Sequence, residues 1–262
     1  MDIIPLLVLI LVFFVTSIIS VITGSTSLIT IPVMLQVGVE AHTAIATNML
    51  ALTFMSIGGT LPFIGKNTID INRLPLLILL TIAGSILGAL LVLIVPTKAM
   101  PVIISCFMVA IAAFSIVNRD AGLDTAAASP SPAAVVAAYG VTFILGIYGG
   151  FFSGGYVTLL TAAYVALFRM TFLEAVANTK LINVFSSLVA TIIFIINGIV
   201  DYQLGIILSI TMFIGGLVGA QVAIWLSNKW LRRIFITTVI ILAIKTLFDG
   251  FDLFSLSLLP SL

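Results

Sequence analysis

The sequence has very little charge, and this shortage is the first guide to its class. Only 7% of the 262 residues are Asp, Glu, Lys or Arg, whereas an ordinary soluble domain has about 25%. Hydrophobic residues make up 62% of the chain, which is more than a soluble core can bury. A lipid bilayer tolerates this composition because an α-helix satisfies its own backbone hydrogen bonds and exposes only side chains to the lipid. The composition therefore predicts an all-α polytopic membrane protein.

Cysteine, histidine and net charge are equally scarce. Cys106 is the only cysteine and His42 the only histidine, so neither an intrachain disulfide nor a metal cluster is expected. The formal net charge of +1 provides no basic surface for nucleic acid. The first residues lack a basic leader and a small-residue cleavage site, so the first apolar run is expected to remain as a span. We expect no cofactor and no bound metal.

Apolar runs separated by Gly, Pro, Asn and charged residues fill both halves of the chain. The runs are 3–23, 24–38, 41–64, 74–95 and 99–117, then 133–153, 154–168, 172–196, 204–226 and 232–248. The runs 24–38 and 154–168 hold about 15 residues, or roughly 22 Å of helix, which is less than the roughly 30 Å hydrocarbon core. We expect these two to be broken or re-entrant, and we favour ten segments over eight.

The chain divides into a first repeat, residues 1–118, a polar linker, residues 119–132, and a second repeat, residues 133–262. Adding 131 to a residue number in the first repeat leads to an identical residue at many polar and glycine positions. The matches include Gly24 with Gly155, Asp70 with Asp201, Gly84 with Gly215, Gly88 with Gly219, and Lys98 with Lys229. Matches of these residue types in one register indicate an internal duplication.

Basic residues indicate how the two copies are oriented, since Lys and Arg concentrate in cytoplasmic loops. Lys66 and Arg73 flank a loop whose counterpart around Asp201 has no basic residue. The basic loop at 229–233 corresponds instead to a loop of the first half that keeps only Lys98. The bias swaps between the copies, which predicts two inverted repeats of about five transmembrane segments each. Both termini are then expected outside, with the linker in the cytoplasm.

Glycine and hydroxyl residues open the two short runs, where a substrate site is expected. Inverted-repeat transporters hold substrate near the midplane, between broken helices whose N-terminal ends carry partial positive charge. The candidate substrate-binding residues in and after the two breaks are Gly24, Ser25, Thr26, Thr47, Asn48, Ser153, Gly154, Gly155, Asn178, Lys180 and Asn183. Together they predict an anion-binding site. The alternative is that Gly and Ser only permit close helix packing, as expected for Gly84 and Gly88.

Lys180 is the most informative of these residues, because a cation inside an apolar segment costs about 2.5–3.5 kcal/mol and usually faces a cavity. Its counterpart in the first repeat is Met49, so the duplication imposes no structural need for charge at this position. Asn183 follows one turn later and shares the same helix face. The alternatives are that Lys180 snorkels to the membrane surface or pairs with Glu174.

At these two breaks the sequence resembles the sulfite exporter TauE/SafE family. The resemblance rests on a Gly/Ser-rich break, an apolar half-helix and an Ala-x-x-Asn/Thr element at 24–48 and again at 149–180, and it covers nearly the whole chain. The first copy departs from a glycine-rich pattern, with Ser-Thr-Ser at 25–27 where the second has Tyr-Val-Thr at 156–158. The resemblance implies a bacterial or archaeal inner-membrane protein that exports sulfite, organosulfonates or related sulfur anions.

We therefore expect a multi-pass secondary transporter of the cell membrane, and not an enzyme, that exports a small sulfur-containing anion by alternating access. No Gly-x-x-x-x-Gly-Lys-Ser/Thr motif for ATP is present, and Glu40, His42 and Glu174 are candidate proton carriers or simply solvated groups. An anion channel is the nearest alternative, and an intramembrane enzyme a more distant one. The expected partners are a small anionic substrate and the lipid bilayer, without nucleic acid. A homodimer is the alternative to a single chain.

Overall fold

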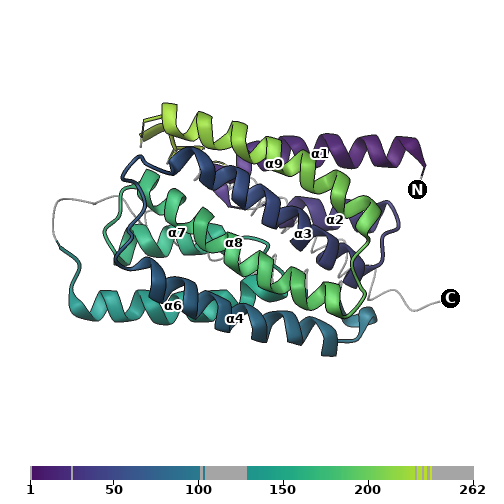
Figure 1. Ribbon diagram of the computed structural model, residues 1–262, viewed down its shortest axis with the longest axis horizontal. Coiled ribbons are helices and arrows are strands. Elements are labelled where there is room, and N and C mark those ends of the chain that lie inside the picture. Colours follow the sequence, from purple (N-terminus) through teal and green to yellow (C-terminus); the bar gives the residue numbers. More distant parts are fainter. Residues whose placement is uncertain are drawn as a thin grey trace.

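The computed structural model consists of α-helices that lie side by side (Figure 1). It describes residues 2–24, 26–100, 103, 129–227, 229–231, 233, 234 and 237, and contains no strand within them. Among the described residues, six helices are long and apolar enough to cross a membrane. They are α1 (Ile3–Thr23), α3 (Ala41–Thr60), α4 (Leu74–Ile94), α6 (Pro132–Phe151), α8 (Phe172–Ile196) and α9 (Tyr202–Trp225). The prediction of an all-α polytopic membrane protein is confirmed.

Two further helices are too short to cross alone. They are α2 (Ser27–Gln36), with 10 residues, and α7 (Tyr156–Leu167), with 12 residues. The 3-10 turns η1 (Leu61–Phe63) and η2 (Thr97–Ala99) follow α3 and α4. The predicted runs at 99–117 and 232–248, and the linker up to residue 128, lie largely outside the described residues.

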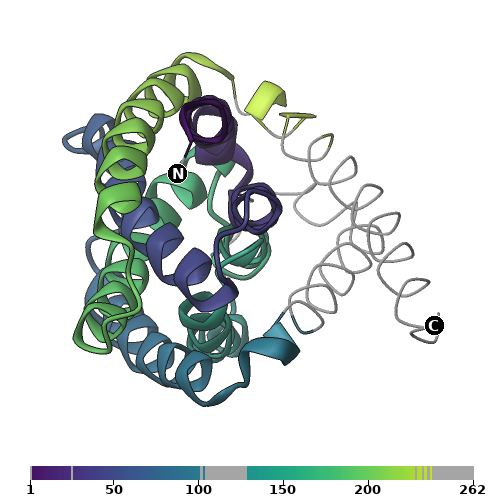
Figure 2. The same ribbon diagram turned by 90° about the vertical axis from the view of Figure 1, so that its right-hand side faces the viewer.

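The long helices form a curved layer in which neighbours pack in the order α1, α9, α3, α8, α4, α6. In Figure 1 this layer runs from α9 and α1 at the top to α4 and α6 at the bottom. The short helices α2 and α7 lie together on the concave side of this layer, between α1 and α6 (Figure 2). α2 packs against α1 and α3, and α7 against α6 and α8. Each short helix is therefore held by the two long helices that flank it in the sequence.

The two central helices, α3 and α8, run antiparallel. Thr53 Oγ1 lies 3.3 Å from Thr191 Oγ1, and Asn183 Nδ2 donates a hydrogen bond to Ser56 Oγ at 2.6 Å. Residue numbers therefore rise along α3 as they fall along α8. The beginnings of these two helices consequently lie at opposite ends of the bundle, measured along the helix axes.

Glycines bring α4 against α6 and α9 against α1. A Cβ atom at Gly84 would lie 2.6 Å from the carbonyl oxygen of Phe143, and one at Gly88 would lie 1.9 Å from that of Ile147. On the other side, a Cβ atom at Gly219 would lie 2.5 Å from the carbonyl oxygen of Ile18. Only glycine allows helix backbones to approach this closely. The packing role expected for Gly84 and Gly88 agrees with these contacts.

Candidate substrate-binding site

Both short helices begin beside a glycine with left-handed backbone geometry. Gly24, the C-cap of α1, has φ 74°, and Gly155, the N-cap of α7, has φ 76°. Glycine adopts this conformation without the steric cost that a side chain imposes. Ser153, buried just before α7, also has a positive φ of 64°, while Ser25 lies outside the described residues. The two glycines that match in the sequence repeat thus share one backbone conformation.

The two breaks contact one another in the interior. Thr158 Oγ1 donates a hydrogen bond to the carbonyl oxygen of Thr23 at 2.5 Å. A Cβ atom at Gly24 would lie 2.5 Å from the backbone nitrogen of Thr158, and one at Gly154 would lie 2.9 Å from the Leu28 side chain. The first turns of α2 and α7 are therefore neighbours. Two helix N-terminal ends placed together in an apolar interior favour a negatively charged ligand.

Lys180 reaches this region from α8, where it is the ninth of 25 residues. Its side chain is 1% exposed. Its Nζ donates a hydrogen bond at 2.8 Å to the carbonyl oxygen of Ser20, which also accepts from the Gly24 N–H group. The side chain therefore points inward and does not snorkel. Pairing with Glu174 is not observed, because the Glu174 carboxylate accepts from the Thr171 backbone in a capping box.

Asn183 and Thr26 contact the same stretch of α3 that Lys180 passes. The Asn183 amide bonds to Ser56, Thr26 Oγ1 lies 3.5 Å from the sulfur of the preceding Met55, and a Cβ atom at Gly59 would lie 3.7 Å from Lys180 Cδ. Side chains from α2 and α8 thus converge on residues 55–59 of α3. We call Gly24, Thr26, Ser56, Lys180 and Asn183 the Lys180 cluster.

Two other predicted residues on α3 have different contacts. Asn48 accepts a hydrogen bond from Thr30 Oγ1 at 2.7 Å and donates one to Ser27 Oγ at 2.9 Å. It therefore holds the beginning of α2 against α3. Thr47 Oγ1 accepts a hydrogen bond at 3.0 Å from the backbone N–H group of Asp201, the N-cap of α9. Within the described part of the chain, no hydrogen bond or ion pair joins either side chain to Lys180.

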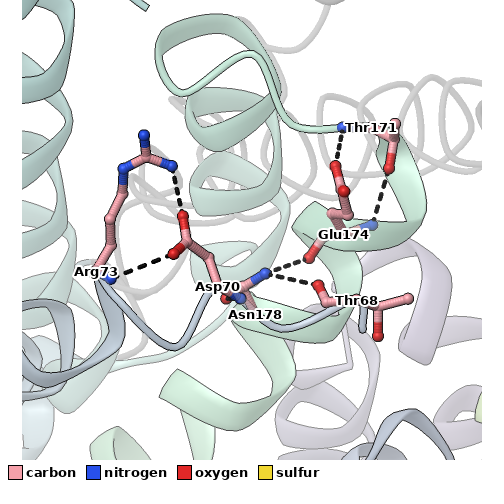
Figure 3. Close-up of polar contacts among 6 residues, drawn as sticks. All are labelled: Thr68, Asp70, Arg73, Thr171, Glu174 and Asn178. Atoms are coloured by element: carbon pink, nitrogen blue, oxygen red, sulfur yellow. Dashed lines mark hydrogen bonds and ion pairs between the residues drawn. The ribbon is translucent and has the colours of Figure 1, made fainter. Parts of the chain in front are cut away.

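Asn178 lies in a separate polar group at the beginning of α8 (Figure 3). Its Oδ1 accepts from the backbone N–H group of Asp70 at 3.0 Å, and its Nδ2 donates to the carbonyl oxygens of Thr68 at 3.1 Å and Glu174 at 2.8 Å. Asp70 in turn forms an ion pair with Arg73. Asn178 thus ties the segment before α4 to the beginning of α8, away from the Lys180 cluster.

The other titratable candidates lie at helix ends. The Glu40 carboxylate accepts a hydrogen bond from the Thr43 backbone at 3.0 Å and caps α3. Partial burial raises the pKa of Glu40, but hydrogen bonds from Thr43 and His42 and the nearby His42 ring lower it overall below its usual value. His42 Nε2 lies 3.1 Å and 3.0 Å from the carbonyl oxygens of Val92 and Val95 at the end of α4. These groups join helix ends and do not reach the Lys180 cluster.

Sequence reasoning missed two members of this region. Ser56 matches Ser187 in the 131-residue register, and that match was a signal that could have identified it. Ser20 contributes its backbone carbonyl oxygen to Lys180. The pattern of side chains carries no signal for such a backbone contact.

Comparison with known proteins decides the family. The sequence model of the family described as "Sulfite exporter TauE/SafE" matches residues 9–246. The chain belongs to this family. Among its relatives, the probable membrane transporter protein ORF9 from Sinorhizobium sp is 28% identical to this chain over 236 residues, which cover 90% of each protein. No solved structure matches.

Two further relatives extend the same description. The probable membrane transporter protein YfcA of Escherichia coli strain K12 is 27% identical over 235 residues, covering 87% of this chain and 84% of the relative. A probable membrane transporter protein of Haemophilus influenzae is 24% identical over 244 residues, covering 93% and 95%. As a TauE/SafE member whose described part holds six long apolar helices, the chain is a multi-pass transporter of the cell membrane and not an enzyme.

Proposed function

We propose that the chain is a secondary transporter that exports a small sulfur-containing anion, sulfite or an organosulfonate, bound at the Lys180 cluster. The observation that carries the proposal is a buried ammonium that bonds to the last turn of α1, at the break where the first turns of two short helices meet. Each contributes positive potential in an apolar interior, where charges are poorly screened. The family name supports a sulfur anion, and a sulfonate offers oxygens for several donors at once.

The predicted site residues take two proposed roles. Lys180, Asn183 and Thr26, with the backbone at Gly24 and at 153–155, hold the anion. Asn48 positions the beginning of α2, and Ser25 lies between Gly24 and Thr26 in the sequence. Thr47 and Asn178 are proposed to hold the two ends of the bundle closed, because their polar atoms bond to the segments before α9 and α4.

The two halves, 1–118 and 133–262, are proposed to be inverted repeats joined by the linker 119–132. Supporting this, repeat-related residues make the same contact with the halves exchanged. Thr47 accepts from the Asp201 backbone and Asn178 accepts from the Asp70 backbone, and a shift of 131 residues converts one pair into the other. Likewise α4 packs on α6 while α9 packs on α1, and the central pair α3 and α8 is antiparallel.

These two exchanged contacts lie at opposite ends of the bundle along the helix axes, because Thr47 and Asn178 each lie near the beginning of one of two antiparallel helices. We propose that they close the two ends and release in turn, so that the anion site opens to one side at a time. An anion channel would require both ends to be open together. Single-channel currents from the purified protein would therefore favour the channel over alternating access.

The orientation in the membrane follows from the basic residues. Lys66, Arg73 and Arg169 belong to the end where α3 finishes and α8 begins, and we propose that this end faces the cytoplasm. A cysteine replacing exposed Ser129 in a Cys106→Ser background is expected to react with an impermeant thiol reagent only after cells are opened. A cysteine replacing Asn197, exposed at the opposite end, should react in intact cells. Labelling of position 129 from outside intact cells would contradict the orientation.

The function itself is tested by anion binding to the purified protein. We expect sulfite or an organosulfonate to raise the thermal unfolding temperature, since a ligand at about 100 times its Kd adds about 2.7 kcal/mol of stability. Sulfite, sulfate, taurine, sulfoacetate and acetate form the panel, with acetate as the anion without sulfur. The cluster is built from one chain, so binding is expected whether the protein is a single chain or a homodimer. An unfolding temperature that no sulfur anion changes would refute the proposal.

A further inference from the structure

Asn183 carries a buried acceptor that nothing in the described structure satisfies. The side chain is 2% exposed. Its Nδ2 donates to Ser56 Oγ at 2.6 Å, whereas its Oδ1 has no hydrogen-bond partner among the described residues. Folded proteins leave few such atoms unpaired, because a buried polar atom that has lost water without gaining a partner is costly. A ligand is a natural source of the missing partner at a substrate site.

The position of this acceptor relates it to the proposed anion. Asn183 follows Lys180 by three residues on α8, so the two side chains leave the same face of the helix. Both reach residues 55–59 of α3. An anion held by the Lys180 ammonium and extending along this face of α8 would meet an amide oxygen that can only accept. Two acceptors facing each other repel, so a second ligand oxygen without hydrogen is poorly matched to this side of the site.

We infer that the bound anion also carries a hydrogen-bond donor, a hydroxyl or an ammonium group, which donates to Asn183 Oδ1. The inference rests on the proposed function, since it takes the anion to be held at Lys180. Asn183 is then a specificity-determining residue. The substrate class is a short sulfonate bearing a hydroxyl or amino group, in preference to an unsubstituted alkylsulfonate or one bearing a carboxylate. A site that pairs a ligand donor discriminates strongly against an analogue lacking it.

The test compares two sulfonates of equal charge and equal number of non-hydrogen atoms. In 2-hydroxyethanesulfonate a hydroxyl group stands where 1-propanesulfonate has a methyl group. We expect the purified wild-type protein to bind the hydroxyl ligand, or 2-aminoethanesulfonate, at least about tenfold more tightly than 1-propanesulfonate. Asn183→Leu should abolish the preference. Asn197→Leu, at the exposed C-cap of the same helix, should retain it.

Each other outcome has a defined meaning. Equal binding of the three sulfonates to the wild-type protein would overturn the inference, and would indicate that the amide is turned with Nδ2 toward the anion. Binding of none of them, with sulfite still stabilising the protein, would also overturn it and leave the proposed function standing. Absence of binding by every sulfur anion would refute the proposed function itself. The wild-type comparison decides the question even if Asn183→Leu does not fold.

Discussion

Replacing Lys180 by methionine is expected to weaken anion binding about ten- to hundredfold while leaving the protein folded. A charge-assisted hydrogen bond from a buried ammonium contributes about 1.5–3 kcal/mol to binding, and about 1.4 kcal/mol corresponds to tenfold in affinity. Methionine is the residue at the repeat-related position 49, and its unbranched side chain fills a similar space. The Ser20 carbonyl oxygen keeps its hydrogen bond from Gly24. Titration of the purified variant with sulfite or a sulfonate measures the change.

A matched variant separates the local charge from the overall charge. Lys66→Met removes the same charge from an exposed position before α4 and should leave the affinity unchanged. Lys180→Arg retains the charge, although its larger planar group need not fit. If Lys180→Met binds as tightly as the wild-type protein, the ammonium does not contact the anion. The N-terminal ends of α2 and α7 would then be the whole site.

Replacing Gly88 by alanine is expected to destabilise the protein severely. The added Cβ atom would lie 1.9 Å from the carbonyl oxygen of Ile147 and 2.7 Å from the backbone nitrogen of Phe151. Both are backbone atoms of α6, so no side-chain rotation relieves the overlap and the two helices must separate. Overpacking a well-packed core typically costs about 1–3 kcal/mol of stability, and occasionally more. We expect Gly88→Ala to cost at least this much, because the backbones themselves must move apart.

The control for this prediction is Gly140→Ala, the same substitution on α6. No described residue lies within 4 Å of a Cβ atom at Gly140, so this variant should be as stable as the wild-type protein or about 0.5–1 kcal/mol more stable. Thermal unfolding in detergent, read as the fraction that remains monodisperse, compares the two variants. A Gly88→Ala protein that melts like the wild-type protein would show that α4 and α6 do not approach so closely.

Most of the helical framework could be predicted, because a chain that crosses lipid must satisfy its own backbone hydrogen bonds and a continuous apolar run does so as a helix. The predicted runs 3–23 and 172–196 agree with the bounds of α1 and α8. The predicted short runs 24–38 and 154–168 contain α2 and α7 but are longer than these helices. The observed helices begin later because residues at Gly24 and at 153–155 form the turns that precede them.

The site was less predictable, because it depends on contacts between residues far apart in the chain. Lys180 and Asn183 stand out in the sequence as polar residues on one helix face. Thr47 and Asn178 have the same polar character, yet they bond to the segments before α9 and α4. Hydrophobic periodicity describes which face of a helix is apolar, but it does not say which distant loop that face will meet.

The contact between the two breaks has a consequence for stoichiometry. A duplicated sequence suggests two equivalent sites per chain, one in each copy. Here the Thr158 hydroxyl of the second copy bonds to Thr23 of the first, and the single buried cation, Lys180 among the described residues, bonds to Ser20 of the first copy. In the proposed site, therefore, neither half is complete alone. The proposed repeats would then supply two half-sites that join, and we expect one chain to carry one anion per cycle.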